Sequence, residues 1–176
     1  AERRIGKTTI IKKMNAEPKP NWVPVLQELE KCHSAAEFAM AVYKEVHQFL
    51  SGRGRLARRA KEWFAAFQGT EIGGLFTLPE GKEKSWKEIL TKSIEDLVHE
   101  SDSKADRLVF LWDEVPFMLA NIRDREGEQT AMEVMDTLRA LRQTHSALRM
   151  VLTGSIGLHH VITSLKDAKY GNAPIN

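Results

Sequence analysis

The sequence predicts an α/β fold in which a parallel sheet is covered by helices on both faces, giving three layers. Segments with the character of strands alternate with segments that carry apolar residues at helical spacing, and such alternation is typical of parallel sheets. The run LVFLW at 108–112 is apolar throughout, as in a strand that is buried on both faces. With 176 residues, the chain is expected to form one domain, 1–176.

The first half of the chain contains one predicted strand and four predicted helices. Alternation and a high content of Val and Leu predict the strand over 22–29, and Pro24 places it at an edge of the sheet. Capping boxes that begin at Ser34 and Ser85 open helices that run to about residues 50 and 100. Helical spacing also predicts helices over 8–15 and 55–67, whereas 69–81 is rich in turn residues.

The second half follows the same alternation. After the strand at 108–112, we expect a charged loop with Arg123 and Arg125, a helix over 128–144, a strand over 148–152 and a helix over 156–165. The two loop arginines are interpreted as surface charge, with an arginine finger across a subunit interface as the alternative.

Composition excludes several classes of protein. Hydrophobic residues make up 42% and charged residues 28% of the chain, which is typical of globular proteins. The net charge of +2 gives no general argument for nucleic-acid binding. The single cysteine, Cys32, cannot form an internal disulfide, so we expect a structural thiol and a cytoplasmic location. No apolar run approaches the roughly 20 residues of a membrane span, so no membrane partner is expected.

The ends of the chain lack expected elements. A phosphate-binding loop normally follows a buried strand, yet residue 1 already falls in the loop, and no closing element is evident near residue 176. We therefore expect a fold that is incomplete at both ends and belongs to a longer chain. If the preceding strand is absent, the open sheet edges should make this segment prone to aggregation.

The motif Gly6-Lys7-Thr8 is the core of a phosphate-binding loop. In such a loop, backbone N–H groups and a helix N-terminus surround the phosphates, and glycine permits their close approach. Lys7 is expected to reach the β- and γ-phosphates of ATP, and the Thr8 hydroxyl to hold Mg²⁺. A complete motif has a further glycine at position 1, where this chain has alanine. The expected phosphate-binding residues are Arg4, Ile5, Gly6, Lys7, Thr8 and Thr9.

Two acids follow the buried strand. Asp113 and Glu114 stand at its carboxyl end, the edge at which open α/β sheets bind ligands. We expect Asp113 to hold Mg²⁺ and Glu114 to activate the water that attacks a phosphate. The alternative is that Asp113 only caps the turn. At the end of the next strand, the hydroxyls of Thr153 and Ser155 are expected to contact the γ-phosphate, and for Ser155 a helix N-cap is an equal alternative.

These three motifs together resemble the AAA-like branch of P-loop ATPases, with the archaeal-type and signal-transducing (STAND) NTPases. The resemblance rests on Arg-Arg-Ile-Gly-Lys-Thr, the apolar strand with Asp-Glu, and Leu-Thr-Gly-Ser. It implies a P-loop NTPase fold of the ASCE, AAA-like type, with Walker A at 1–8, Walker B at 108–114 and sensor 1 at 153–155. It also implies a five-stranded core, of which about three strands occur here.

The sequence therefore predicts a Mg²⁺-dependent ATPase, for which a homo-oligomer or a complex with a partner protein is possible. One alternative is a regulatory module that binds ATP or ADP with little turnover. Another is a DNA-engaged ATPase that uses the basic cluster at 53–61, although a solvated helix face is the simpler interpretation of that cluster. The adjacent residues His159 and His160 point about 100° apart on a helix, so they are not expected to share a metal ion.

Overall fold

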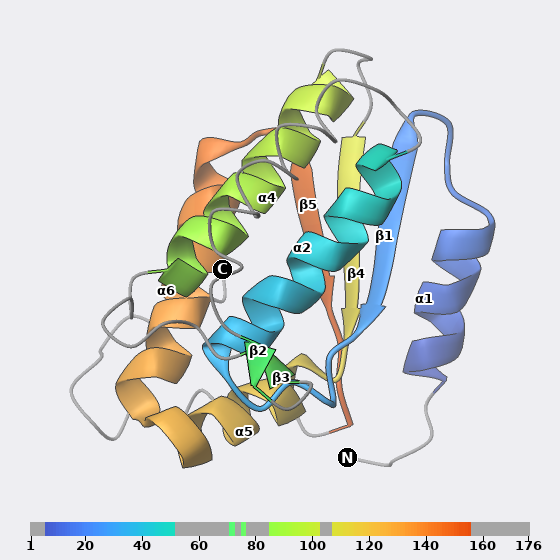
Figure 1. Ribbon diagram of the computed structural model, residues 1–176. Helices are drawn as coiled ribbons and strands as arrows, with labels where there is room; N and C mark the ends of the chain where they lie inside the picture. The colour runs from blue at the N-terminus through green and yellow to red at the C-terminus, as the bar shows by residue number, and fades with distance from the viewer. Residues whose placement is uncertain (1–5, 52–70, 73–74, 77–84, 103–106, 156–176) are drawn as a thin grey trace.

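The computed structural model describes residues 6–51, 71–72, 75–76, 85–102 and 107–155 (Figure 1). Several expectations lie outside these residues: the contacts of Arg4 and Ile5, the helix over 55–67 with its basic cluster, and the helix over 156–165 with its histidine pair. Within the described part of the chain, none of the helices combines the length and the apolar character that crossing a membrane requires.

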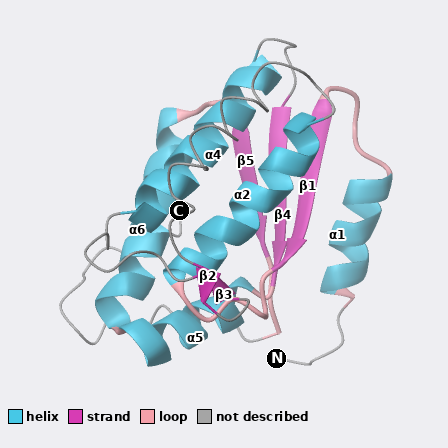
Figure 2. Ribbon diagram, in the orientation of Figure 1, coloured by secondary structure: helices cyan, strands magenta, loops and turns pink. Residues whose placement is uncertain are grey.

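Three parallel strands form the main sheet, which confirms the predicted α/β class (Figure 2). They are β1 (Trp22–Glu28), β4 (Arg107–Asp113) and β5 (Leu148–Leu152), in the order β1-β4-β5. The register pairs Glu28 with Asp113 and Trp112 with Leu152, so all three strands end together. β1 pairs only with β4 among the described strands, and this edge position tolerates Pro24, which has no N–H to donate.

The described residues form five helices around this sheet and at its end: α1 (Lys7–Ala16), α2 (Ala35–Ser51), α4 (Ser85–Asp102), α5 (Val115–Glu126) and α6 (Glu128–Thr144). A separate antiparallel ladder joins β2 (Glu71–Ile72) to β3 (Leu75–Phe76). The Ser34 capping box forms in part. The Ser34 hydroxyl accepts the Glu37 N–H at 3.0 Å, but the Glu37 carboxylate accepts the N–H of His33, at 2.7 Å, and not that of Ser34.

The two faces of the sheet are buried against different helices. On β4, Leu108, Phe110 and Trp112 belong to the large core that contains residues of α2, α4, α5 and α6. Val109 and Leu111 point to the opposite face, where they pack with Ile11 of α1. β4 is therefore buried on both sides, as its continuous apolar run predicted.

The segment after β4 corrects the sequence analysis. Arg123 and Arg125 lie in the last turn of α5, not in a loop. The helix forms because Val115, Met118, Leu119 and Ile122, at intervals of three and four residues, bury one apolar stripe. Its charged C-terminal turn obscured this pattern in the sequence.

The strand ends and the first turn of α1 lie at the same end of the molecule (Figure 1). This arrangement brings together residues from three distant parts of the chain. It is the basis of the candidate site.

Candidate functional site at the carboxyl edge of the sheet

Asp113, the last residue of β4, is the centre of a polar cluster at the strand ends. Its Oδ2 accepts a hydrogen bond of 2.5 Å from the hydroxyl of Thr8 in the first turn of α1. These two residues are 105 positions apart in the sequence. The contact joins the Gly-Lys-Thr motif to the acid pair, two motifs that the sequence analysis assigned to the same Mg²⁺ ion.

The other carboxylate oxygen of Asp113 is also held. Its Oδ1 accepts a 2.6 Å hydrogen bond from the Thr153 hydroxyl and a 3.1 Å hydrogen bond from the N–H of Glu114. Thr153 reaches Asp113 because β5 lies next to β4, and the Thr153 N–H continues the ladder by donating to the carbonyl of Trp112 at 2.8 Å. Asp113 is therefore fixed by groups from α1, from the turn after β4 and from the segment after β5.

These contacts influence the pKa of Asp113, which is only 6% exposed. Burial is the largest single influence and acts to raise the pKa of Asp113. The hydrogen bonds from Thr153, Thr8 and the Glu114 N–H, together with the positive charge of Lys7, outweigh it, so the pKa is lowered. Asp113 is consequently an ionised carboxylate at neutral pH.

The start of α1 has the properties of an anion site. Gly6 precedes the helix with φ of 69°, in the left-handed region that glycine adopts without strain. The N-cap residue Gly6 has no side chain with which to cap the helix, and N–H groups at a helix start can bind an anion. A Cβ at Gly6 would meet no atom within 4 Å. The need for glycine here is thus conformational, and the adjacent space is open.

Glu114 lies in the turn between β4 and α5. Its φ of 59° places a non-glycine residue in the left-handed region, a strained conformation that occurs preferentially at functional sites. Its Oε2 accepts two hydrogen bonds from Ser155, one from the N–H at 3.0 Å and one from the hydroxyl at 2.9 Å. Ser155 thus contacts an acid. The N-cap alternative concerns a helix after residue 155, outside the described residues, and the phosphate contact stays a prediction.

A close backbone approach supports this arrangement. A Cβ placed on Gly154 would lie 2.4 Å from Cδ of Pro116 in α5, so only glycine fits without movement of the helix. The Val115 N–H donates to the carbonyl of Thr153 at 3.1 Å. The turns after β4 and β5 are therefore packed directly against each other.

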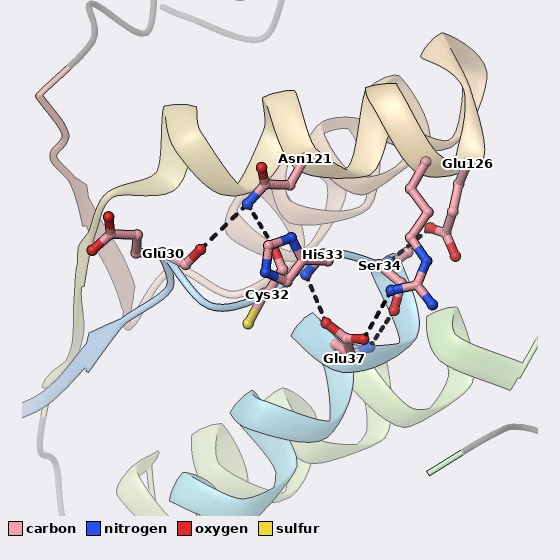
Figure 3. Close-up of polar contacts among 9 residues, drawn as sticks. Glu30, Cys32, His33, Ser34, Glu37, Asn121 and Glu126 are labelled. Atoms are coloured by element: carbon pink, nitrogen blue, oxygen red, sulfur yellow. Dashed lines mark hydrogen bonds and ion pairs between the residues drawn. The ribbon is translucent and has the colours of Figure 1, made fainter. Parts of the chain in front are cut away.

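The far end of α5 is fixed by a second polar network (Figure 3). The Asn121 amide donates to the carbonyls of Glu30 and Cys32, both at 3.3 Å. The Glu126 carboxylate accepts the Ala35 N–H at the start of α2, at 2.8 Å. Because α5 begins at the residue after Glu114, these contacts anchor the helix that follows the catalytic candidate.

The remaining candidates have other surroundings. Thr9 is exposed on α1. Arg125 pairs with Glu37 at 3.3 Å and Arg123 with its neighbour Asp124 at 2.8 Å, which agrees with surface charge. Cys32 is buried, and burial, aided by the charge of Glu37, raises the pKa of its thiol to about 11, in agreement with a structural role.

Thr8 and Asp113 are the described residues best suited to hold a metal ion. Carboxylate and hydroxyl oxygens are ligands that Mg²⁺ prefers. Among the described residues, no group of three or more His, Cys, Asp or Glu side chains could form a complete metal site. A cation held by Thr8 and Asp113 would therefore need further ligands from outside these two side chains.

The fold and this cluster define an α/β protein with a polar site at the carboxyl edge of a parallel sheet. Comparison of the chain with protein-family models, curated proteins and solved structures found no significant match. Of the residues at this site, Pro116 had no part in the sequence analysis, and Gly154 entered it only as a member of the Leu-Thr-Gly-Ser motif. Gly154 follows a strand and a threonine, a signal for a tight turn, but the sequence does not reveal its contact with Pro116.

Proposed function

We propose that this protein binds ATP with Mg²⁺ at the carboxyl edge of its sheet and hydrolyses it, as a P-loop ATPase of the AAA-like or STAND-like type. The observation that carries the proposal is the 2.5 Å hydrogen bond between Thr8 and Asp113. It brings an uncapped helix start that carries a lysine against a buried, ionised carboxylate. A triphosphate with its metal ion needs this pair of opposite charges, because the lysine neutralises phosphate and the carboxylate holds the cation.

Each residue then has a distinct role. The N–H groups at the start of α1 bind phosphate oxygens, and Lys7 neutralises their charge. Thr8 and Asp113 hold Mg²⁺, which supplies further charge neutralisation when bound. Thr153 orients Asp113 through its 2.6 Å hydrogen bond.

Glu114 acts on the water. The water oxygen attacks the γ-phosphorus, one water proton passes to the Glu114 carboxylate, and the bond from the γ-phosphorus to the bridging oxygen breaks. ADP leaves with that electron pair, and inorganic phosphate is released.

The single buried thiol agrees with action in a reducing compartment such as the cytoplasm.

The test uses the full-length protein and measures ATP affinity by calorimetry and turnover by phosphate release. Lys7→Ala should weaken ATP binding by more than about tenfold, because the phosphate charge loses its partner. Lys12→Ala, an exposed position on the same helix, is the matched control and should bind normally. Binding by Lys7→Ala that equals the parent would overturn the site.

Glu114→Gln and Asp113→Asn test the acids. The glutamine variant should bind ATP but lose turnover by about a hundredfold or more, the usual contribution of a general base. The asparagine variant should lose the response of ATP affinity to Mg²⁺, whereas Asp136→Asn on the exposed face of α6 should change neither property. ATP binding without phosphate release by the parent would replace hydrolysis with the regulatory alternative.

A further inference from the structure

The segment after β5 contacts each acid of the pair with a different residue. Thr153 donates to Asp113 and Ser155 donates to Glu114. Both Ser155 donors, the N–H and the hydroxyl, converge on one atom, Oε2 of Glu114. The hydroxyl is a single donor, so in this structure it is not available to donate to a phosphate.

We propose that Ser155 is a positioning residue that orients the Glu114 carboxylate towards the attacking water, and that it does not contact the γ-phosphate. This inference rests on the proposed ATPase function. Two donors on Oε2 fix the rotation of the carboxylate. No described residue donates to the second oxygen, Oε1, so that oxygen can accept the proton of water. Holding a base in its reactive orientation increases the rate, because less conformational entropy is lost when the transition state forms.

Backbone contacts hold Ser155 in a fixed position relative to Glu114. Its neighbour Gly154 is buried and sits directly on Pro116. The Thr153 N–H donates to the carbonyl of Trp112 at 2.8 Å, and the Val115 N–H donates to the carbonyl of Thr153 at 3.1 Å. These two hydrogen bonds tie the segment after β5 to the backbone on both sides of Glu114. Ser155 and Glu114 therefore keep their relative positions through the backbone, and the side-chain hydrogen bond selects one orientation of the carboxylate.

The test compares Ser155→Ala and Ser155→Thr in the full-length protein with ATP and Mg²⁺. The alanine variant should lower kcat about tenfold, since it removes one hydrogen bond to a charged group and leaves the N–H in place. The KM for ATP should stay within about twofold. Threonine keeps the hydroxyl and should restore most of kcat. Ser146→Ala, an exposed serine that precedes β5, should match the parent.

A double-mutant cycle separates positioning from phosphate contact. If Ser155 acts through Glu114, adding Ser155→Ala to Glu114→Gln should cause no further loss of single-turnover rate. If Ser155 contacts phosphate, the losses should multiply and KM should rise, which would overturn the inference while ATP hydrolysis stands. An unchanged kcat in a folded Ser155→Ala protein would also overturn it. A parent that does not hydrolyse ATP would remove the proposed function itself, and this inference with it.

Discussion

Gly154→Ala is the change that most directly probes how the site is held. The added Cβ would lie 2.4 Å from Cδ and 2.8 Å from Cγ of Pro116. The proline ring is rigid and buried in the first turn of α5, so the backbone of one of the two turns must move. Overpacking of this kind costs typically about 1–3 kcal/mol. We take a loss of about 2 kcal/mol in the free energy of unfolding. For a chain of this size, each kcal/mol lowers the melting temperature by about 2–4 °C, so we expect it to fall by roughly 4–8 °C.

The assay is thermal denaturation followed by circular dichroism, with phosphate release measured on the same samples. Activity should fall together with stability, because Thr153 and Ser155 on either side of Gly154 hold the two acids. Pro116→Ala provides the control. In the Pro116→Ala variant, Gly154→Ala should lower the melting temperature less than it does in the parent, because the ring atoms that would clash with the new Cβ are absent. A melting temperature unchanged within about 1 °C, or equal costs in both backgrounds, would refute the reasoning.

Two further predictions concern titratable groups. Since the pKa of Asp113 is lowered in the folded protein, its ionised form stabilises the fold above the unfolded pKa, about 4, and this contribution is lost as pH falls through the folded pKa. Urea unfolding in the presence of a chelator should therefore show a loss of stability towards low pH that shrinks in Asp113→Asn and persists in Asp136→Asn. Cys32, with its thiol pKa raised to about 11, should react with iodoacetamide much more slowly in the native protein than in urea at mildly alkaline pH, and equal rates would contradict its burial.

The elements that were predicted well are those whose burial leaves a plain pattern. β4 reads as a strand because both of its faces are buried, and α6 follows its apolar stripe from Glu128 to Thr144. α5 was missed although Val115, Met118, Leu119 and Ile122 carry the helical spacing. Pro116 and four consecutive charged residues at 123–126 suggest a loop when they are considered alone. The structure shows that proline is accommodated in the first turn, where its missing N–H has no cost.

The candidate site could be predicted in its parts but not in its contacts. Gly6-Lys7-Thr8, the acid pair and the hydroxyls after β5 were all recognised from residue type and position. Which hydroxyl meets which acid depends on the strand order, since β5 delivers Thr153 and Ser155 only because it pairs with β4. Periodicity does not encode that order. The left-handed conformation of Glu114 likewise follows from the tight turn into α5.

The Thr8–Asp113 hydrogen bond has a consequence for metal binding. A threonine hydroxyl has one proton and two lone pairs. In this structure the proton is donated to Asp113, so the lone pairs of Thr8 remain free to bind a cation. In the proposed Mg²⁺ site, the carboxylate would thus orient the hydroxyl as a metal ligand. Because the described residues offer no larger ligand cluster, Mg²⁺ alone should bind weakly, and phosphate oxygens should supply the affinity. Metal and nucleotide are therefore expected to bind cooperatively, each completing the site for the other.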